Sequence, residues 1–127
     1  MPEPSPKLFY PQHFLEVARD LAAAPTNEAK LRAAVSRAYY ALFLMVRDKA
    51  NIIGKDSVHE RAKTAVAAKS AAAGGTFQTL RELRTHADYV LKPGDSGYDP
   101  AYDDWEGNWK NAEWCCASLL AFLAQWP

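Results

Sequence analysis

A chain of 127 residues is long enough for one domain and short for two. Hydrophobic residues make up 49% and charged residues 24%, an ordinary globular mixture that excludes a disordered, collagen-like or low-complexity chain. The 15 Lys and Arg residues balance the 15 Asp and Glu residues, so the formal net charge is zero. The chain therefore lacks a strongly basic coat for nucleic acid, and any RNA contact has to rely on a local patch.

Nothing in the sequence predicts a membrane-bound or exported protein. The N-terminal run Met-Pro-Glu-Pro-Ser-Pro lacks the basic and apolar regions of a signal peptide. The longest apolar stretches fall far short of the roughly 20 residues that span a bilayer. Cys115 and Cys116 are neighbours whose side chains diverge by about 100° on a helix, so we expect two buried, reduced thiols and no disulfide. These observations predict a cytoplasmic protein.

The first residues differ in composition from the rest of the chain. Residues 1–9 carry three prolines and predict a flexible arm ahead of a single domain over residues 10–127. A first helix is expected from Pro11, which suits a first turn, to just before Pro25. Apolar residues recur at helical spacing between these two prolines.

A long second helix is expected next. Thr26 or Asn27 is suited to cap it, and we expect it to reach about Ile53, with Gly54 as its stop. One side is an apolar stripe made of Leu31, Val35, Ala38, Leu42, Met45 and Val46. The opposite side, which is not a normal solvated face, carries Ala33, Arg37, Tyr40, Ala41 and Leu44. A helix of this kind is buried on both sides, so we expect a homodimer through the second side. The alternative is a central helix covered by the chain's own loops.

Two further helices are expected before a loop. The third opens with Ser57-Val58-His59-Glu60, a capping-box pattern, and is expected to stop at Gly74-Gly75. The fourth is expected from Thr76 to about Leu91, because Pro93 follows.

The remaining residues predict a loop and a last helix. Residues 92–102 contain Pro, Gly, Asp and Ser and indicate the loop. Residues 103–125 carry three of the four tryptophans and predict the helix. The expected fold class is all-α, an up-and-down bundle of four to five helices.

Two motifs resemble those of HEPN-domain proteins. The run Ser36–Phe43 (SRAYYALF) resembles the SRAYYAxF helix of that family, and Leu83–Tyr89 (LRTHADY) is similar to its second signature, Arg-x-x-Ala-Asp-Tyr. Their order, and their separation of about 45 residues, match small stand-alone HEPN proteins, which are often encoded beside a minimal nucleotidyltransferase. The resemblance covers residues 10 to 125 and implies a HEPN-like helical bundle that dimerises, with a nucleotidyltransferase or antitoxin as a possible partner.

The resemblance also implies an activity. Many HEPN proteins are metal-independent endoribonucleases of toxin–antitoxin or defence systems, with the signature Arg, four to six residues, then His; Arg81 and His86 match it. RNA supplies the 2′-OH nucleophile, a His transfers the proton, and an Arg stabilises the charge on phosphorus, so neither metal nor cofactor is needed. The implied roles are phosphate stabilisation by Arg81 and Arg84, acid–base catalysis by His86, and orientation of an Arg by Asp88.

A second function is compatible with the same residues. Arg81 and His86 lie about 140° apart on an ideal helix, whereas Arg84 and Asp88 share a face and can form an ion pair. The alternative is a non-catalytic HEPN module that binds a nucleotide or RNA or docks a nucleotidyltransferase. A structural helical adaptor is a third possibility. An Arg and a His meeting in one cleft would favour the enzyme. His86 pointing away from an Arg84 that is held by Asp88 would favour the binding module.

Other candidate residues are assigned as follows. We expect Arg37, Tyr40 and Tyr89 to contact substrate; the alternative for the tyrosines is a place in the core. His13 and His59 stand alone near helix starts and are expected to be exposed. The carboxylates between residues 95 and 106 lack a calcium-loop spacing, so no metal site is expected.

Overall fold

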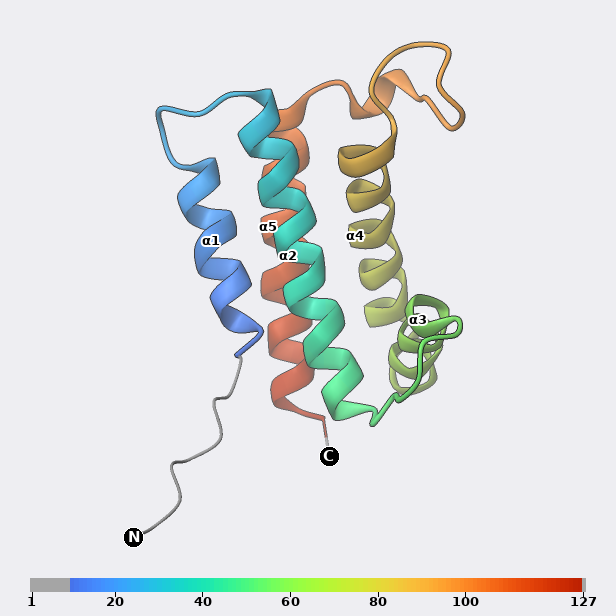
Figure 1. Ribbon diagram of the computed structural model, residues 1–127. Coiled ribbons are helices and arrows are strands. Elements are labelled where there is room, and N and C mark those ends of the chain that lie inside the picture. Colours follow the sequence, from blue (N-terminus) through green and yellow to red (C-terminus); the bar gives the residue numbers. More distant parts are fainter. Residues whose placement is uncertain (1–9, 127) are drawn as a thin grey trace, which may run out of the picture.

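The computed structural model describes residues 10–126, and the arm expected at residues 1–9 lies outside them. The described part is helical and contains no strand, which confirms the all-α class (Figure 1). The elements are α1 (Gln12–Ala22), α2 (Glu28–Lys49), α3 (Val58–Lys69), α4 (Ala71–Tyr89), the short 3-10 helix η1 (Pro100–Tyr102) and α5 (Trp105–Ala124). Helices α1, α2, α4 and α5 run up and down, and the short α3 lies beside the lower end of α4 (Figure 1).

Helix α2 is the centre of the bundle. It packs against α1, α3, α4 and α5. Its buried side chains face several directions and include Leu31, Ala34, Val35, Ala38, Tyr39, Ala41, Leu42, Phe43 and Val46. The chain's own helices therefore account for much of the double burial that the sequence attributed to a partner subunit. A homodimer stays a prediction.

The end of α2 was predicted too late. Asn27 caps the helix as expected, since its side chain accepts a hydrogen bond from the Lys30 amide over 2.9 Å. The helix ends at Lys49, however, and Asn51 takes a left-handed conformation with φ 54°. Arg47 folds back and donates to the carbonyl of Ile52, so the turn has its own hydrogen-bond partner and does not need Gly54 as a stop.

The boundary between α3 and α4 also differs from the prediction. The break falls at Ser70, whose extended backbone separates the helices and whose side chain accepts from the Ala73 amide over 3.1 Å. Gly74 lies inside α4, where a Cβ atom would come within 2.6 Å of the Ala67 Cβ of α3. This glycine therefore marks the close approach of two helices. The predicted capping box is also wrong, because Ser57 is left-handed and its side chain makes no capping hydrogen bond.

Replacing Gly74 with alanine is expected to lower the free energy of unfolding by about 1–3 kcal/mol, because the new methyl group collides with Ala67. Gly75→Ala is the matched control. Nothing lies within 4 Å of a Cβ at Gly75, so this change should stabilise α4 by about 0.5–1 kcal/mol. Urea denaturation of both variants measures the difference, and equal effects would contradict the assigned close approach.

The last helix is close to its predicted range. Asp104 caps α5 by accepting from the Gly107 amide over 3.0 Å. Cys115 and Cys116 are buried and free, as expected, and burial raises the pKa of their thiols to about 11 and about 12, respectively. Within residues 10–126, no helix is long and apolar enough to cross a membrane.

Candidate functional site

Arg84 is the centre of a polar cluster between α2 and α4. Its Nη2 donates to the Tyr40 hydroxyl over 2.5 Å, and its Nε lies 2.9 Å from Oδ2 of Asp88. The Asp88 contact is an ion pair whose geometry falls short of a hydrogen bond. Ser36 donates to the same Asp88 oxygen over 3.1 Å. The structure therefore brings the two HEPN-like motifs together, because Ser36 and Tyr40 come from the first motif and Arg84 and Asp88 from the second.

Aromatic rings surround the Arg84 guanidinium. Its Cζ lies 5.0 Å from the ring centre of Tyr40, 5.2 Å from that of Tyr89 and 5.8 Å from that of Tyr39. These distances are those of cation–π contacts. Tyr39 is fully buried, and burial raises the pKa of its hydroxyl, whereas Tyr89 is 65% exposed. Tyr39 is thus a core residue, and Tyr89 offers a ring to solvent beside a cation.

Arg81 extends this cluster along α4. Its Nη1 donates to Oε2 of Glu60 over 2.8 Å, which joins α4 to the first turn of α3. We call the face made by Tyr40, Arg81, Arg84 and Tyr89 the arginine–tyrosine surface. Both of its arginines are paired with carboxylates, so a phosphate group would have to replace or share those partners.

His59 belongs to this neighbourhood, contrary to the prediction that it is exposed. It is half-buried, its ring stacks on Phe43 at a centroid distance of 4.2 Å, and its Nδ1 lies 2.6 Å from the Tyr39 hydroxyl. Its ring also meets the Tyr40 ring edge-to-face at 6.1 Å. Burial, followed by the positive charges of Arg84 and Arg81, lowers the pKa of His59 below its ordinary value.

The lowered pKa gives the protein a predicted pH dependence. A His whose pKa is lower in the folded than in the unfolded state stabilises the fold above the unfolded value of about 6.5 and loses that contribution as the pH falls. The free energy of unfolding should therefore fall more steeply from pH 7 to pH 5 in the wild type than in His59→Gln. Urea denaturation at several pH values measures this difference, and parallel curves would contradict the assignment.

His86 does not belong to the arginine–tyrosine surface. Its Nδ1 is 3.0 Å from the carbonyl oxygen of Glu82, its Nε2 is 3.1 Å from that of Gly97, and its ring stacks on Tyr102 at 3.8 Å. It points toward the loop after α4, whereas Arg84 points toward α2. The structure therefore does not bring His86 together with Arg84 or with the Glu60-bound Arg81.

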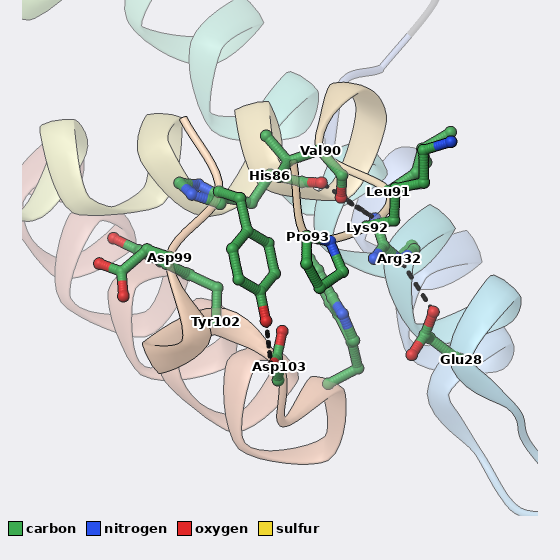
Figure 2. Close-up of a pocket in the computed structure, with 12 residues that line it drawn as sticks. Glu28, Arg32, His86, Val90, Leu91, Lys92, Pro93, Asp99, Tyr102 and Asp103 are labelled. Carbon is green, nitrogen blue, oxygen red and sulfur yellow. Dashed lines mark hydrogen bonds and ion pairs between the residues drawn. The ribbon is translucent and has the colours of Figure 1, made fainter. Parts of the chain in front are cut away.

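The side chain of His86 lines a cavity of about 220 Å³ at the C-terminal end of α4 (Figure 2). Arg32 reaches into this region and donates through Nη1 to the carbonyl oxygens of His86, Ala87 and Val90 over 2.8–3.3 Å. Its Nε pairs with Glu28, and its guanidinium covers the Trp105 ring at 4.4 Å. Arg32 thus caps α4 from α2.

Arg37, which was predicted to contact substrate, also lies away from the arginine–tyrosine surface. It is exposed, and its guanidinium is 5.5 Å from the ring centre of Phe14 on α1. It therefore packs on the α1 side of α2, whereas Tyr40 and Arg84 meet on the α4 side.

Two further observations concern metal binding and similarity to known proteins. Within residues 10–126, no three His, Cys, Asp or Glu side chains are placed to hold a metal ion. No protein-family model, curated protein or solved structure matches the chain. The HEPN resemblance accordingly rests on the two sequence motifs, and membership of that family stays a prediction.

Proposed function

We propose that this chain is a HEPN-like, RNA-binding module that takes a phosphate and a neighbouring base on its arginine–tyrosine surface. The observation that carries the proposal is the placement of Arg84 between the rings of Tyr40 and Tyr89. Arginine is suited to bind phosphate, and an exposed aromatic ring is suited to stack on an unpaired base. Tyr89 supplies such a ring, since 65% of its surface is exposed.

The geometry favours binding over the catalysis implied by Arg81 and His86. His86 directs both ring nitrogens at backbone carbonyl oxygens, and Arg84 is held by Asp88. Arg81 is paired with Glu60 of α3. The Arg-x4-His match therefore does not form a common site within one chain, which supports the non-catalytic alternative.

The same proposal includes partners. The HEPN resemblance supports a homodimer and a nucleotidyltransferase or antitoxin that acts together with the module. These partners rest on the sequence motifs alone. The toxin–antitoxin or defence setting has the same basis.

Binding of a fluorescently labelled, single-stranded 2′-O-methyl RNA tests the function. This probe presents phosphates and bases but lacks the nucleophilic 2′-OH, so binding is measured apart from cleavage. Fluorescence anisotropy should show binding that weakens as salt is raised, because phosphate contacts release counterions. Arg19→Gln, on the exposed side of α1, is the control and should bind as the wild type does. No binding at low salt, or no loss in Arg84→Gln, would overturn the proposal.

A further inference from the structure

His86 places both of its ring nitrogens against backbone carbonyl oxygens. Nδ1 lies 3.0 Å from the oxygen of Glu82, one turn earlier on α4, and Nε2 lies 3.1 Å from that of Gly97, in the loop after the helix. A carbonyl oxygen can only accept a hydrogen bond. A neutral imidazole carries one N–H, whereas an imidazolium carries two. The two contacts can therefore both be hydrogen bonds only when the ring is protonated.

The contact with Gly97 connects the tip of this loop to a helix. The other hydrogen bonds of residues 93–98 are local: the Asp95 side chain accepts from the amides of Leu91 and Lys92, and the Tyr98 hydroxyl donates to Asp103. Within the part of the chain that the structure describes, the only hydrogen bond between residues 93–98 and a helix is that of His86. The loop is therefore attached through a side chain whose charge changes between pH 5 and pH 8.

The His86 ring has a second support that does not depend on its charge. It stacks on Tyr102 at a centroid distance of 3.8 Å, with 15° between the ring planes. Tyr102 is itself held by α5, because the Asn108 side chain donates to its carbonyl oxygen over 2.8 Å. The ring thus keeps its position between α4 and η1 when it loses a proton, and the change falls on its contact with Gly97.

Charged groups of three parts of the chain lie around the His86 ring; they are Glu28 and Arg32 of α2, Glu82 of α4, and Lys92, Asp99 and Asp103 between α4 and α5. Glu28 and Arg32 pair with each other, which leaves three carboxylates and one lysine. These surroundings therefore do not oppose a positive charge on the ring. The hydrogen bond to Asp103 raises the pKa of Tyr98, and burial raises that of Tyr102, so both hydroxyls stay neutral while the ring titrates.

We propose that His86 is a pH-sensitive latch for the loop of residues 92–98. In the protonated state, Nε2 donates to Gly97 and the loop stays attached to α4. In the neutral state, Nδ1 keeps the single N–H, because its acceptor Glu82 belongs to the helix and cannot move away. Nε2 then turns a lone pair toward the Gly97 oxygen, and the two repel each other. Pro93 and Tyr98 line the cavity of about 220 Å³, so release of the loop widens this cavity (Figure 2).

Nuclear magnetic resonance of the full, ¹⁵N-labelled chain at pH 5.5 and pH 8.5 tests the latch. At pH 5.5, both ring nitrogens of His86 should carry a proton, and the amides of Ser96 and Gly97 should have order parameters of about 0.85, as in rigid backbone. At pH 8.5, Nε2 should be unprotonated, and these order parameters should fall below about 0.6. The Gly97 and Tyr98 amide resonances should shift with the same midpoint as the ring nitrogens.

Two histidine variants identify the group that titrates. His86→Gln removes the titrating ring, so the order of the loop should be the same at both pH values. His13→Gln is the matched control, because His13 is an exposed histidine on α1, and this variant should keep the full response of the loop. If His86→Gln fails to fold, the ring spectra of the wild type decide the matter without it.

Several outcomes would overturn the latch. They are equal loop order at both pH values in the wild type, an ordered loop beside an unprotonated Nε2, and a pH response that persists in His86→Gln or is lost in His13→Gln. The proposal does not rest on the proposed RNA binding, and the experiment contains no RNA. Its failure would therefore leave the binding function standing.

Discussion

Arg32→Ala is expected to lower the free energy of unfolding by about 3 kcal/mol, the largest stability effect that we expect from a single polar side chain in this protein. Arg32 donates to three carbonyl oxygens at the end of α4, where the last carbonyl groups of a helix lack intrahelical partners. Of the three, the carbonyl of His86 also accepts a backbone amide, that of Val90, over 3.2 Å. Its removal also takes a cation from the face of Trp105. Urea denaturation measures the loss, and thermal unfolding should show a fall of about 10 °C.

Two controls distinguish capping by Arg32 from a general loss of charge. Glu28→Gln removes the ion-pair partner of Arg32 but leaves the carbonyl contacts, and should change stability by about 0.5 kcal/mol or less. Arg61→Ala removes an exposed arginine that donates to the Ile53 carbonyl over 2.8 Å, and should also have a small effect. Equal losses in Arg32→Ala and Arg61→Ala would show that the cap contributes little.

Substitutions of Arg84 and of Asp88 should change the affinity for RNA in opposite directions. Arg84→Gln removes the cation at the centre of the arginine–tyrosine surface and is expected to weaken binding of 2′-O-methyl RNA about tenfold. Asp88→Asn removes the carboxylate that competes with phosphate for Arg84, so it should strengthen binding several-fold. Anisotropy titrations at one low salt concentration measure both changes.

If Arg84→Gln is unstable, Asp88→Asn still tests the binding of RNA at the arginine–tyrosine surface. Asp88→Asn is nearly isosteric and retains an oxygen that can accept from Ser36. Weaker binding in Asp88→Asn, at unchanged stability, would mean that the carboxylate itself contacts the ligand or a partner. Unchanged binding in both variants would place the RNA on another face of the bundle.

The helices could be predicted from the sequence because their apolar spacing and capping residues are local signals. The first and last helices came out nearly as expected, and Asn27 caps α2. The break at Ser70 was missed because Gly74-Gly75 is the stronger local stop signal. In the folded chain Gly74 serves a contact with another helix, which no local pattern reveals.

The candidate site was predictable only in part. Arg84 and Asp88 were paired correctly because both lie on one helix, four residues apart. His59 was missed because its partners Tyr39 and Phe43 lie on α2, and their contact depends on how α2 and α3 cross. The only available signal was the pair of aromatic residues four apart on the second helix. Their spacing predicts that the two rings share one face of the helix, but it does not identify the residue that packs against them. His86 was assigned from motif spacing, which does not specify the side of the helix that faces the site.

Helix α3 packs mainly on α4, makes fewer contacts with α2, and lies at the edge of the bundle (Figure 1). Its link to α2 includes the ring of His59, seated between Tyr39 and Phe43. Exchange of α3 backbone amides should therefore begin earlier than exchange within α2. When this short helix detaches, His59 leaves the hydroxyl of Tyr39, and Glu60 leaves Arg81, so the arginine–tyrosine surface loses the carboxylate that pairs with one of its arginines. The time for which α3 stays attached therefore sets how long Arg81 remains paired.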